Sequence, residues 1–67
     1  MKITGNTIKA KIKSLSGVSA KMVSSDGGNH FTVYLENRAD NFKVAYAIHR
    51  AGWKRTANNE SNICIEV

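Results

Sequence analysis

The stretch VSAKMVSSDGGNHFTVYLE, residues 18–36, predicts a β-hairpin and thereby sets the fold class. In its second half apolar residues alternate with polar ones, which is the period of a strand with one buried face. The central cluster, residues 25–29, is rich in residues that accept the positive φ angles of a tight turn. We therefore expect two paired strands, one over residues 18–24 and one over residues 30–36.

The same alternation assigns each hairpin side chain to a face. The apolar face is predicted to contain Val18, Ala20 and Met22 from the first strand and Phe31, Val33 and Leu35 from the second. The opposite face is predicted to contain Ser19, Lys21 and Val23 together with Thr32, Tyr34 and Glu36. The second face is polar with one aromatic ring, as expected for the outer side of a sheet.

A helix is predicted before the hairpin, over residues 7–16. Its apolar residues recur at the i, i+4 and i+7 spacing of an amphipathic helix, with Asn6 placed to cap it and Gly17 to end it. Lys9 and Lys13 lie on the opposite side from this stripe. They form a cationic outer face, which solubility alone would also explain.

A second helix is predicted after the hairpin, over residues 38–51, with Asn37 as the cap and Gly52 as the stop. Its apolar residues form two stripes. One contains Val44, Ala45, Ile48 and Ala51, and the other contains Phe42, Tyr46, His49 and Trp53. Two stripes predict a helix that is buried over more than half of its circumference.

The chain ends with an alternating segment, residues 63–67, that predicts a final strand. A shorter strand over residues 53–56 would precede it, separated from it by an Asn-rich turn. The sequence then consists of two αββ units of about 30 residues each. We expect one α+β domain over residues 1–67, in which two helices pack on one face of a four-stranded, mostly antiparallel sheet.

Two alternatives keep the same core and the same class. If residues 53–62 form a loop, the order is αββαβ and the sheet has three strands. If residues 2–4 form a short first strand, the order becomes ferredoxin-like, βαββαβ.

Composition indicates a binding protein with an anionic partner. Ten Lys and Arg residues against five Asp and Glu residues give a formal charge of +5, which attracts polyanions over long range. The single cysteine, Cys64, is typical of a reducing compartment and predicts a cytoplasmic location. The N-terminal residues form no apolar run, so we expect neither a signal peptide nor a membrane span there.

The residues that carry chemistry do not form a catalytic set. Cys64 has no spacing to His30 or His49 that indicates a thiol–imidazole pair, and the carboxylates are scattered. These three residues are also too few and too far apart for a structural zinc site. We therefore expect no enzymatic activity, no cofactor and no metal.

Basic residues interleaved with aromatics form the candidate binding site, because aromatic faces stack on unpaired bases while cations hold the backbone. Its residues are Lys21, Tyr34, Arg50, Trp53, Lys54 and Arg55. Trp53 also continues the second stripe of the second helix, which favours a core position for it over a binding position. The first functional hypothesis is a nucleic-acid-binding accessory module, with Lys21, Tyr34, Lys54 and Arg55 near one sheet face.

The alternative hypothesis is a protein inhibitor that binds and occludes a host enzyme or defence complex, on an acidic or nucleic-acid-binding surface. Very small basic proteins of this character are common among accessory proteins of phages and mobile elements. Aromatic and Arg residues would be its anchors.

A homodimer is also predicted, because a 67-residue fold without a disulfide or a metal has a marginal core. The second stripe of the second helix would be buried between two copies if the first helix does not cover it.

Overall fold

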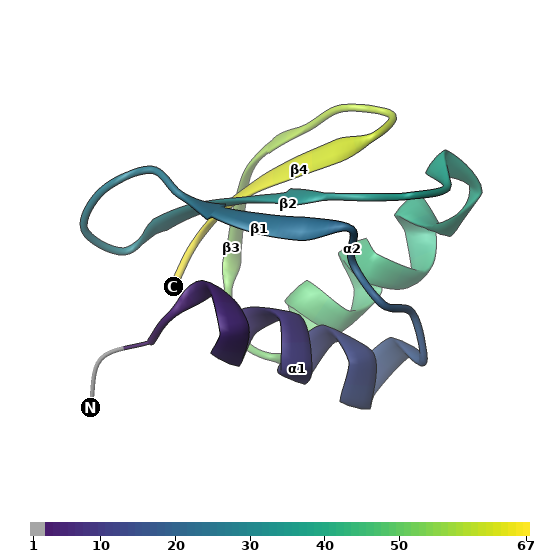
Figure 1. The fold of residues 1–67 in the computed structure, drawn as a ribbon, viewed down its shortest axis with the longest axis horizontal. Helices are drawn as coiled ribbons and strands as arrows, with labels where there is room; N and C mark the ends of the chain where they lie inside the picture. Colours follow the sequence, from purple (N-terminus) through teal and green to yellow (C-terminus); the bar gives the residue numbers. More distant parts are fainter. Residues whose placement is uncertain (1–2) are drawn as a thin grey trace.

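The computed structural model describes residues 3–67. Its elements follow the order αββαββ, with a 3₁₀ turn, η1, before the second helix (Figure 1). The elements are α1 (Gly5–Ser16), β1 (Met22–Ser25), β2 (His30–Tyr34), η1 (Arg38–Asp40), α2 (Asn41–Arg50), β3 (Lys54–Asn58) and β4 (Asn62–Glu66). The predicted α+β class and the two αββ units are confirmed.

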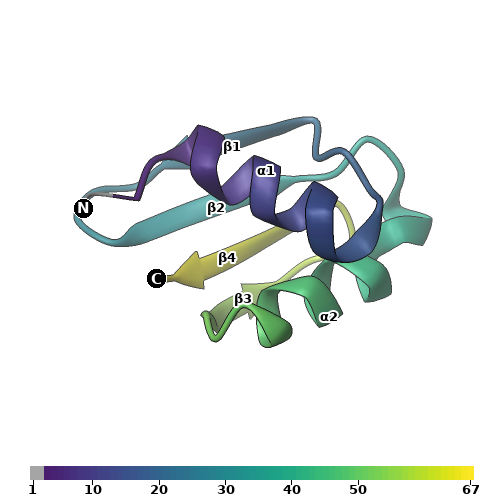
Figure 2. The same ribbon diagram turned by 90° about the horizontal axis from the view of Figure 1, so that it is seen from below.

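The four strands form one antiparallel sheet in the order β1-β2-β4-β3. Both helices lie on the same face of this sheet, side by side, as the views from the side and from below show (Figures 1 and 2). The other face is uncovered, and we call it the open sheet face. The two units meet at the central pair, β2 and β4.

The register of that central pair explains why one face is buried. Phe31 lies opposite Ile65, and Val33 lies opposite Ile63, so four apolar side chains point together at the helices. Ile8 and Ile12 of α1, and Val44 and Ile48 of α2, cover them and are completely buried. Close packing of these branched side chains excludes water from the layer between sheet and helices, which is the main favourable term in folding.

The helix ends follow local chemistry. Thr4 caps α1, because its side-chain oxygen accepts a hydrogen bond from the backbone N–H of Thr7 at 3.3 Å. The prediction that Asn6 is the cap was therefore wrong by two residues. Gly17 ends α1 as predicted, with a φ of 76° that favours glycine.

The second helix begins in two steps. Asn37 caps it as predicted, by accepting the N–H of Ala39, but the first turn is the 3₁₀ turn η1 and the α-helix starts only at Asn41. After α2 the chain turns at Gly52, whose φ is 82°. It then enters β3, so the alternative in which residues 53–62 form a loop was wrong.

The ferredoxin-like alternative was also wrong for the residues that the structure describes. Ile3 and Thr4 belong to no strand, and Lys2 lies outside the described residues.

The predicted faces of the first strand were partly wrong. Met22 lies opposite Tyr34 on the open sheet face and is 49% exposed, whereas Val23 lies opposite Val33 and packs against the core. The reason is a bend at Lys21, which breaks the alternation between the buried Ala20 and the strand. A period of two holds only inside a continuous strand.

Candidate functional site

The outward side of α2 has the most unusual surface of the described chain. Ten residues form this helix, and its exposed positions are all aromatic, cationic or histidine. They are Phe42, Lys43, Tyr46, His49 and Arg50, and we call them the α2 outer face. Phe42 is 87% exposed and Tyr46 is 59% exposed. Phe42, Tyr46 and His49 of the predicted second stripe are therefore exposed and Trp53 is half-buried, so the prediction that more than half of the helix circumference is buried was wrong. The buried residues of α2 lie on one side, where they pack with α1 over the sheet.

Helical spacing orders the α2 outer face into a line. Phe42, Tyr46 and Arg50 follow each other at intervals of four residues, so they stand one above another along the helix. The guanidinium carbon of Arg50 lies 5.8 Å from the centre of the Tyr46 ring, within cation–π range. Lys43 and Arg50 are seven residues apart and flank the aromatic line on one side.

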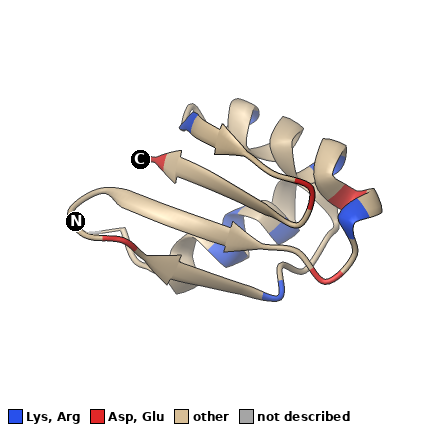
Figure 3. Cartoon of the chain, turned by 90° about the horizontal axis from the view of Figure 1, so that it is seen from above, with Lys and Arg blue, Asp and Glu red and all other residues tan. Residues whose placement is uncertain are grey.

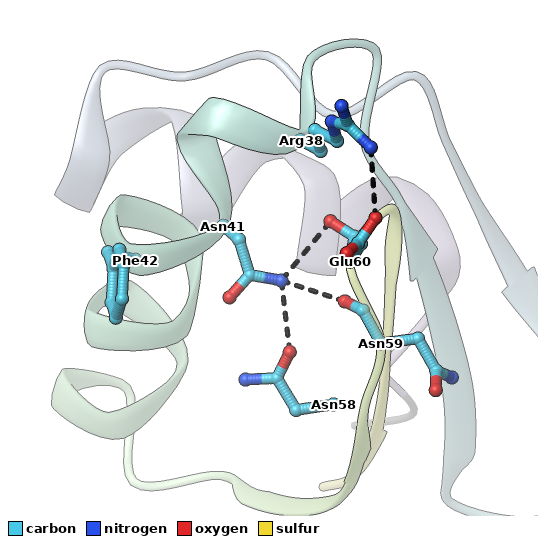
Figure 4. Close-up of a pocket in the computed structure, with 6 residues that line it drawn as sticks. All are labelled: Arg38, Asn41, Phe42, Asn58, Asn59 and Glu60. Carbon is cyan, nitrogen blue, oxygen red and sulfur yellow. Dashed lines mark hydrogen bonds and ion pairs between the residues drawn. The ribbon is translucent and has the colours of Figure 1, made fainter.

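The N-terminal end of α2 is tied to the β3–β4 turn. The side-chain amide of Asn41 donates to the Asn58 side-chain oxygen and to the Asn59 carbonyl, each at 2.9 Å (Figure 4). Arg38 and Glu60 form an ion pair at 3.0 Å across the same place. With Phe42 these residues line a hollow of about 390 Å³ beside the helix. The ring of Phe42 therefore stands at the rim of a surface whose position is held by hydrogen bonds.

The C-terminal end of α2 leads into the cationic start of β3. Trp53 is half-buried and packs against the core, whereas Lys54 and Arg55 are exposed. They line a second hollow, of about 530 Å³, together with His49 of the α2 outer face. β3 is an edge strand, exposed at all five residues, with a bulge between Arg55 and Ala57.

The predicted binding residues fall into two groups. Arg50, Trp53, Lys54 and Arg55 lie together around the turn from α2 to β3. Lys21 and Tyr34 lie at the other end of the sheet. Tyr34 is opposite Asn62, at the start of β4, and Lys54 is opposite Glu66, at its end. Asn62 and Glu66 are four residues apart along β4, so Tyr34 and Lys54 are separated by about 13 Å along the strand direction. The expected single cluster near one sheet face is therefore divided.

The two helices carry basic residues and no acidic ones. Neither α1 nor α2 contains an acidic residue, whereas their cations are Lys9, Lys11, Lys13, Lys43 and Arg50. The acidic residues lie in turns, in η1 and at the end of β4, so the red positions in Figure 3 fall outside α1 and α2, although red and blue are adjacent in η1. Within residues 3–67 the one ion pair is Arg38 with Glu60, so the helical cations are not neutralised by side-chain partners.

The open sheet face offers less for an anionic partner. Its charged residues are Asp26, whose carboxylate accepts a hydrogen bond from Thr32, and Lys54 and Glu66, which lie opposite each other across β3 and β4. Thr32 at its centre is buried between its neighbours, and its hydroxyl is hydrogen-bonded to Asp26 and close to the Cys64 sulfur. The half-buried Cys64 thus lies on the open sheet face and not in the core.

Sequence reasoning missed Phe42, Lys43 and Tyr46 as candidate binding residues. One signal was available: the aromatic stripe of α2 adjoins the charged residues Lys43 and Arg50, whereas the aliphatic stripe does not. A charged neighbour on the same side of a helix indicates solvent, since burying an unpaired charge is costly.

Comparisons of the chain with family models, with curated proteins and with solved structures gave no match. Among residues 3–67 no group of three or more His, Cys, Asp or Glu side chains is placed to hold a metal ion. No helix in that part of the chain is both long enough and apolar enough to cross a membrane. The fold and the surface chemistry therefore define the class: an α+β protein whose helical layer is cationic and carries exposed aromatic rings.

Proposed function

We propose that the protein is an intracellular nucleic-acid-binding accessory module that acts without catalysis. The observation that carries the proposal is the charge of the helical layer: five cations and no carboxylate on the two helices. A surface with one sign of charge attracts a polyanion and releases its condensed counterions on contact. A helical layer that served only solubility would be expected to mix both signs.

The binding surface in this proposal consists of the α2 outer face and the start of β3. Lys43, Arg50, Lys54 and Arg55 are its cations, and Trp53 supports it from the core side. These include four of the six residues singled out in the sequence. Lys21 and Tyr34 lie outside this surface and would not contribute to the main contact.

Fluorescence anisotropy with single-stranded DNA, duplex DNA and RNA at several salt concentrations tests the proposal. If the four cations each neutralise one phosphate, log K should fall with log salt with a slope of about −3 for single strands. Replacing Lys43 with Gln should reduce the magnitude of that slope by about 0.7. Lys21→Gln is the matched control and should leave the slope unchanged. Absence of binding to all three probes at low salt would contradict the proposal.

A second candidate function is supported by a different observation, the 87% exposure of Phe42. An exposed aromatic ring beside Arg50 and Tyr46 is the composition of a protein–protein hot spot. In that case the protein is an inhibitor that occludes a host enzyme or defence complex. Affinity capture from a host lysate distinguishes the two functions: one stoichiometric partner that resists nuclease and is lost with Phe42→Ala supports inhibition.

A further inference from the structure

The rings of the α2 outer face have no role in the core. Val44, Ala45, Ala47 and Ile48 are the buried residues of α2, and they alone pack between the sheet and α1. The exposed positions of α1 offer a comparison: they are Asn6, Thr7, Ala10, Lys11, Lys13 and Ser14, none of them aromatic. Exposed rings are thus particular to α2 and are not a general property of the helical layer.

The surroundings of the rings favour one kind of occupant. Lys43 and Arg50 flank Phe42 and Tyr46, and neither helix has a carboxylate to repel a phosphate. In a contact between two copies of this face the unpaired cations would lose their water without gaining a partner, so that contact is weaker than one with a polyanion. Rings with unpaired cations along one side instead complement a chain that alternates flat bases with phosphates.

The accessibility of the base faces distinguishes paired from unpaired bases as the ligand of these rings. Along α2, residues four apart rise by about 6 Å. In a duplex the bases stack about 3.4 Å apart, and each face is already covered by its neighbour. Only unpaired bases have free faces that a protein ring can cover.

We infer that the α2 outer face binds single-stranded nucleic acid, with Phe42 and Tyr46 stacking on unpaired bases and the Arg50 guanidinium forming a third platform. This inference rests on the proposed function and specifies its substrate class. From Arg50 the strand continues along the hollow between His49 and Lys54–Arg55, where the two cations contact its phosphates.

The test compares oligo(dT), oligo(U) and a hairpin DNA duplex of equal phosphate number, at one salt concentration, by fluorescence anisotropy. We expect the single strands to bind more tightly than the duplex. Phe42→Leu keeps the apolar bulk but removes the aromatic face, and should weaken single-strand binding at least about fivefold. It should leave duplex binding and the salt slope unchanged. Met22→Leu is the matched control, because Met22 is an exposed apolar residue on the open sheet face, and it should change nothing.

Each outcome separates the inference from the proposed function. Equal binding of single strands and duplex, with Phe42→Leu neutral, would overturn the inference and retain a nucleic-acid-binding protein. No binding to any probe would overturn both. A nuclease-resistant protein partner that is lost with Phe42→Leu would also overturn the inference, because the face would then serve a protein. Phe42 is so exposed that the variant keeps the fold, and a thermal melt checks this.

Discussion

Phe42 and Val44 are two positions apart on α2 and differ by almost the full range of exposure, 87% against 0%. Two positions along the helix are about 200° apart around its axis, so Val44 lies in the core while Phe42 lies on the solvent side of α2. Both residues are apolar, so hydrophobicity alone does not separate a core position from a binding position. At the residue scale, stability and function are carried by different sides of the same helix.

This separation predicts opposite consequences for two truncations. Ile48→Ala removes a completely buried side chain and leaves a cavity, so it should lower the free energy of unfolding by about 2–4 kcal/mol. Phe42→Ala removes a larger side chain from the surface and should lower it by less than about 0.5 kcal/mol. Urea denaturation followed by circular dichroism measures both. Comparable losses in the two variants would mean that Phe42 is buried in solution.

At the scale of elements, the contacts that position α2 differ in kind at its two ends. The C-terminal end is continuous with β3 through the turn at Gly52 and is held by Trp53, whose backbone N–H donates to the Ile48 carbonyl at 3.2 Å. The N-terminal end depends on the Asn41 amide, which bridges to a turn 17 residues or more further along the chain. Asn41 is therefore the side chain that holds the Phe42 end of the binding surface in place.

We expect Asn41→Ala to cost about 0.5–1.5 kcal/mol of stability, because its hydrogen bonds to the Asn58 and Asn59 oxygens are replaced by hydrogen bonds to water. Arg38→Gln is the control from the same hollow. Its ion pair with Glu60 is highly exposed, with side chains 74% and 80% accessible, so its loss should cost no more than about 0.5 kcal/mol. Chemical denaturation of both variants decides the order, and a larger loss for Arg38→Gln would contradict this account of the hollow.

At the scale of the whole molecule, the two αββ units combine into one sheet through β2 and β4, and each unit contributes one helix to the same layer. The helices pack against each other and against the sheet, so the inward sides of both are covered within a single chain. Among the described residues, the open sheet face and the α2 outer face stay uncovered, and of these two the α2 outer face carries the exposed rings of Phe42 and Tyr46. The predicted homodimer and the proposed nucleic-acid site therefore involve the same residues.

Competition between these two interactions is the expected result. Without nucleic acid, we expect the mass measured by light scattering after size exclusion to rise above 7.4 kDa with concentration, as two copies bury Phe42 and Tyr46. Saturating oligo(dT) should return the stoichiometry to one chain per complex, and Phe42→Ser should keep the free protein at 7.4 kDa. A mass that stays at 7.4 kDa at every concentration would refute the homodimer.

Local sequence by itself predicted the favoured order of the elements and several of their ends, while two other orders stayed open. Asn37 begins the second helical segment and Gly17 ends the first, because capping oxygens and positive φ angles are properties of one or two residues. Phe31 and Val33 share the buried face, because alternation within a continuous strand leaves no other arrangement.

Tertiary structure decided which apolar groups are buried and which candidate residues meet. Periodicity shows that Phe42 and Tyr46 share a side of α2, but only the position of the sheet and of α1 leaves that side in solvent. Likewise, β4 lies between β2 and β3, and its length separates Tyr34 from Lys54. The physical reason is the sequence separation of the interacting residues. Helix caps and strand alternation depend on residues close in sequence. Burial and the clustering of side chains depend on elements far apart in sequence, whose relative positions the sequence pattern does not give.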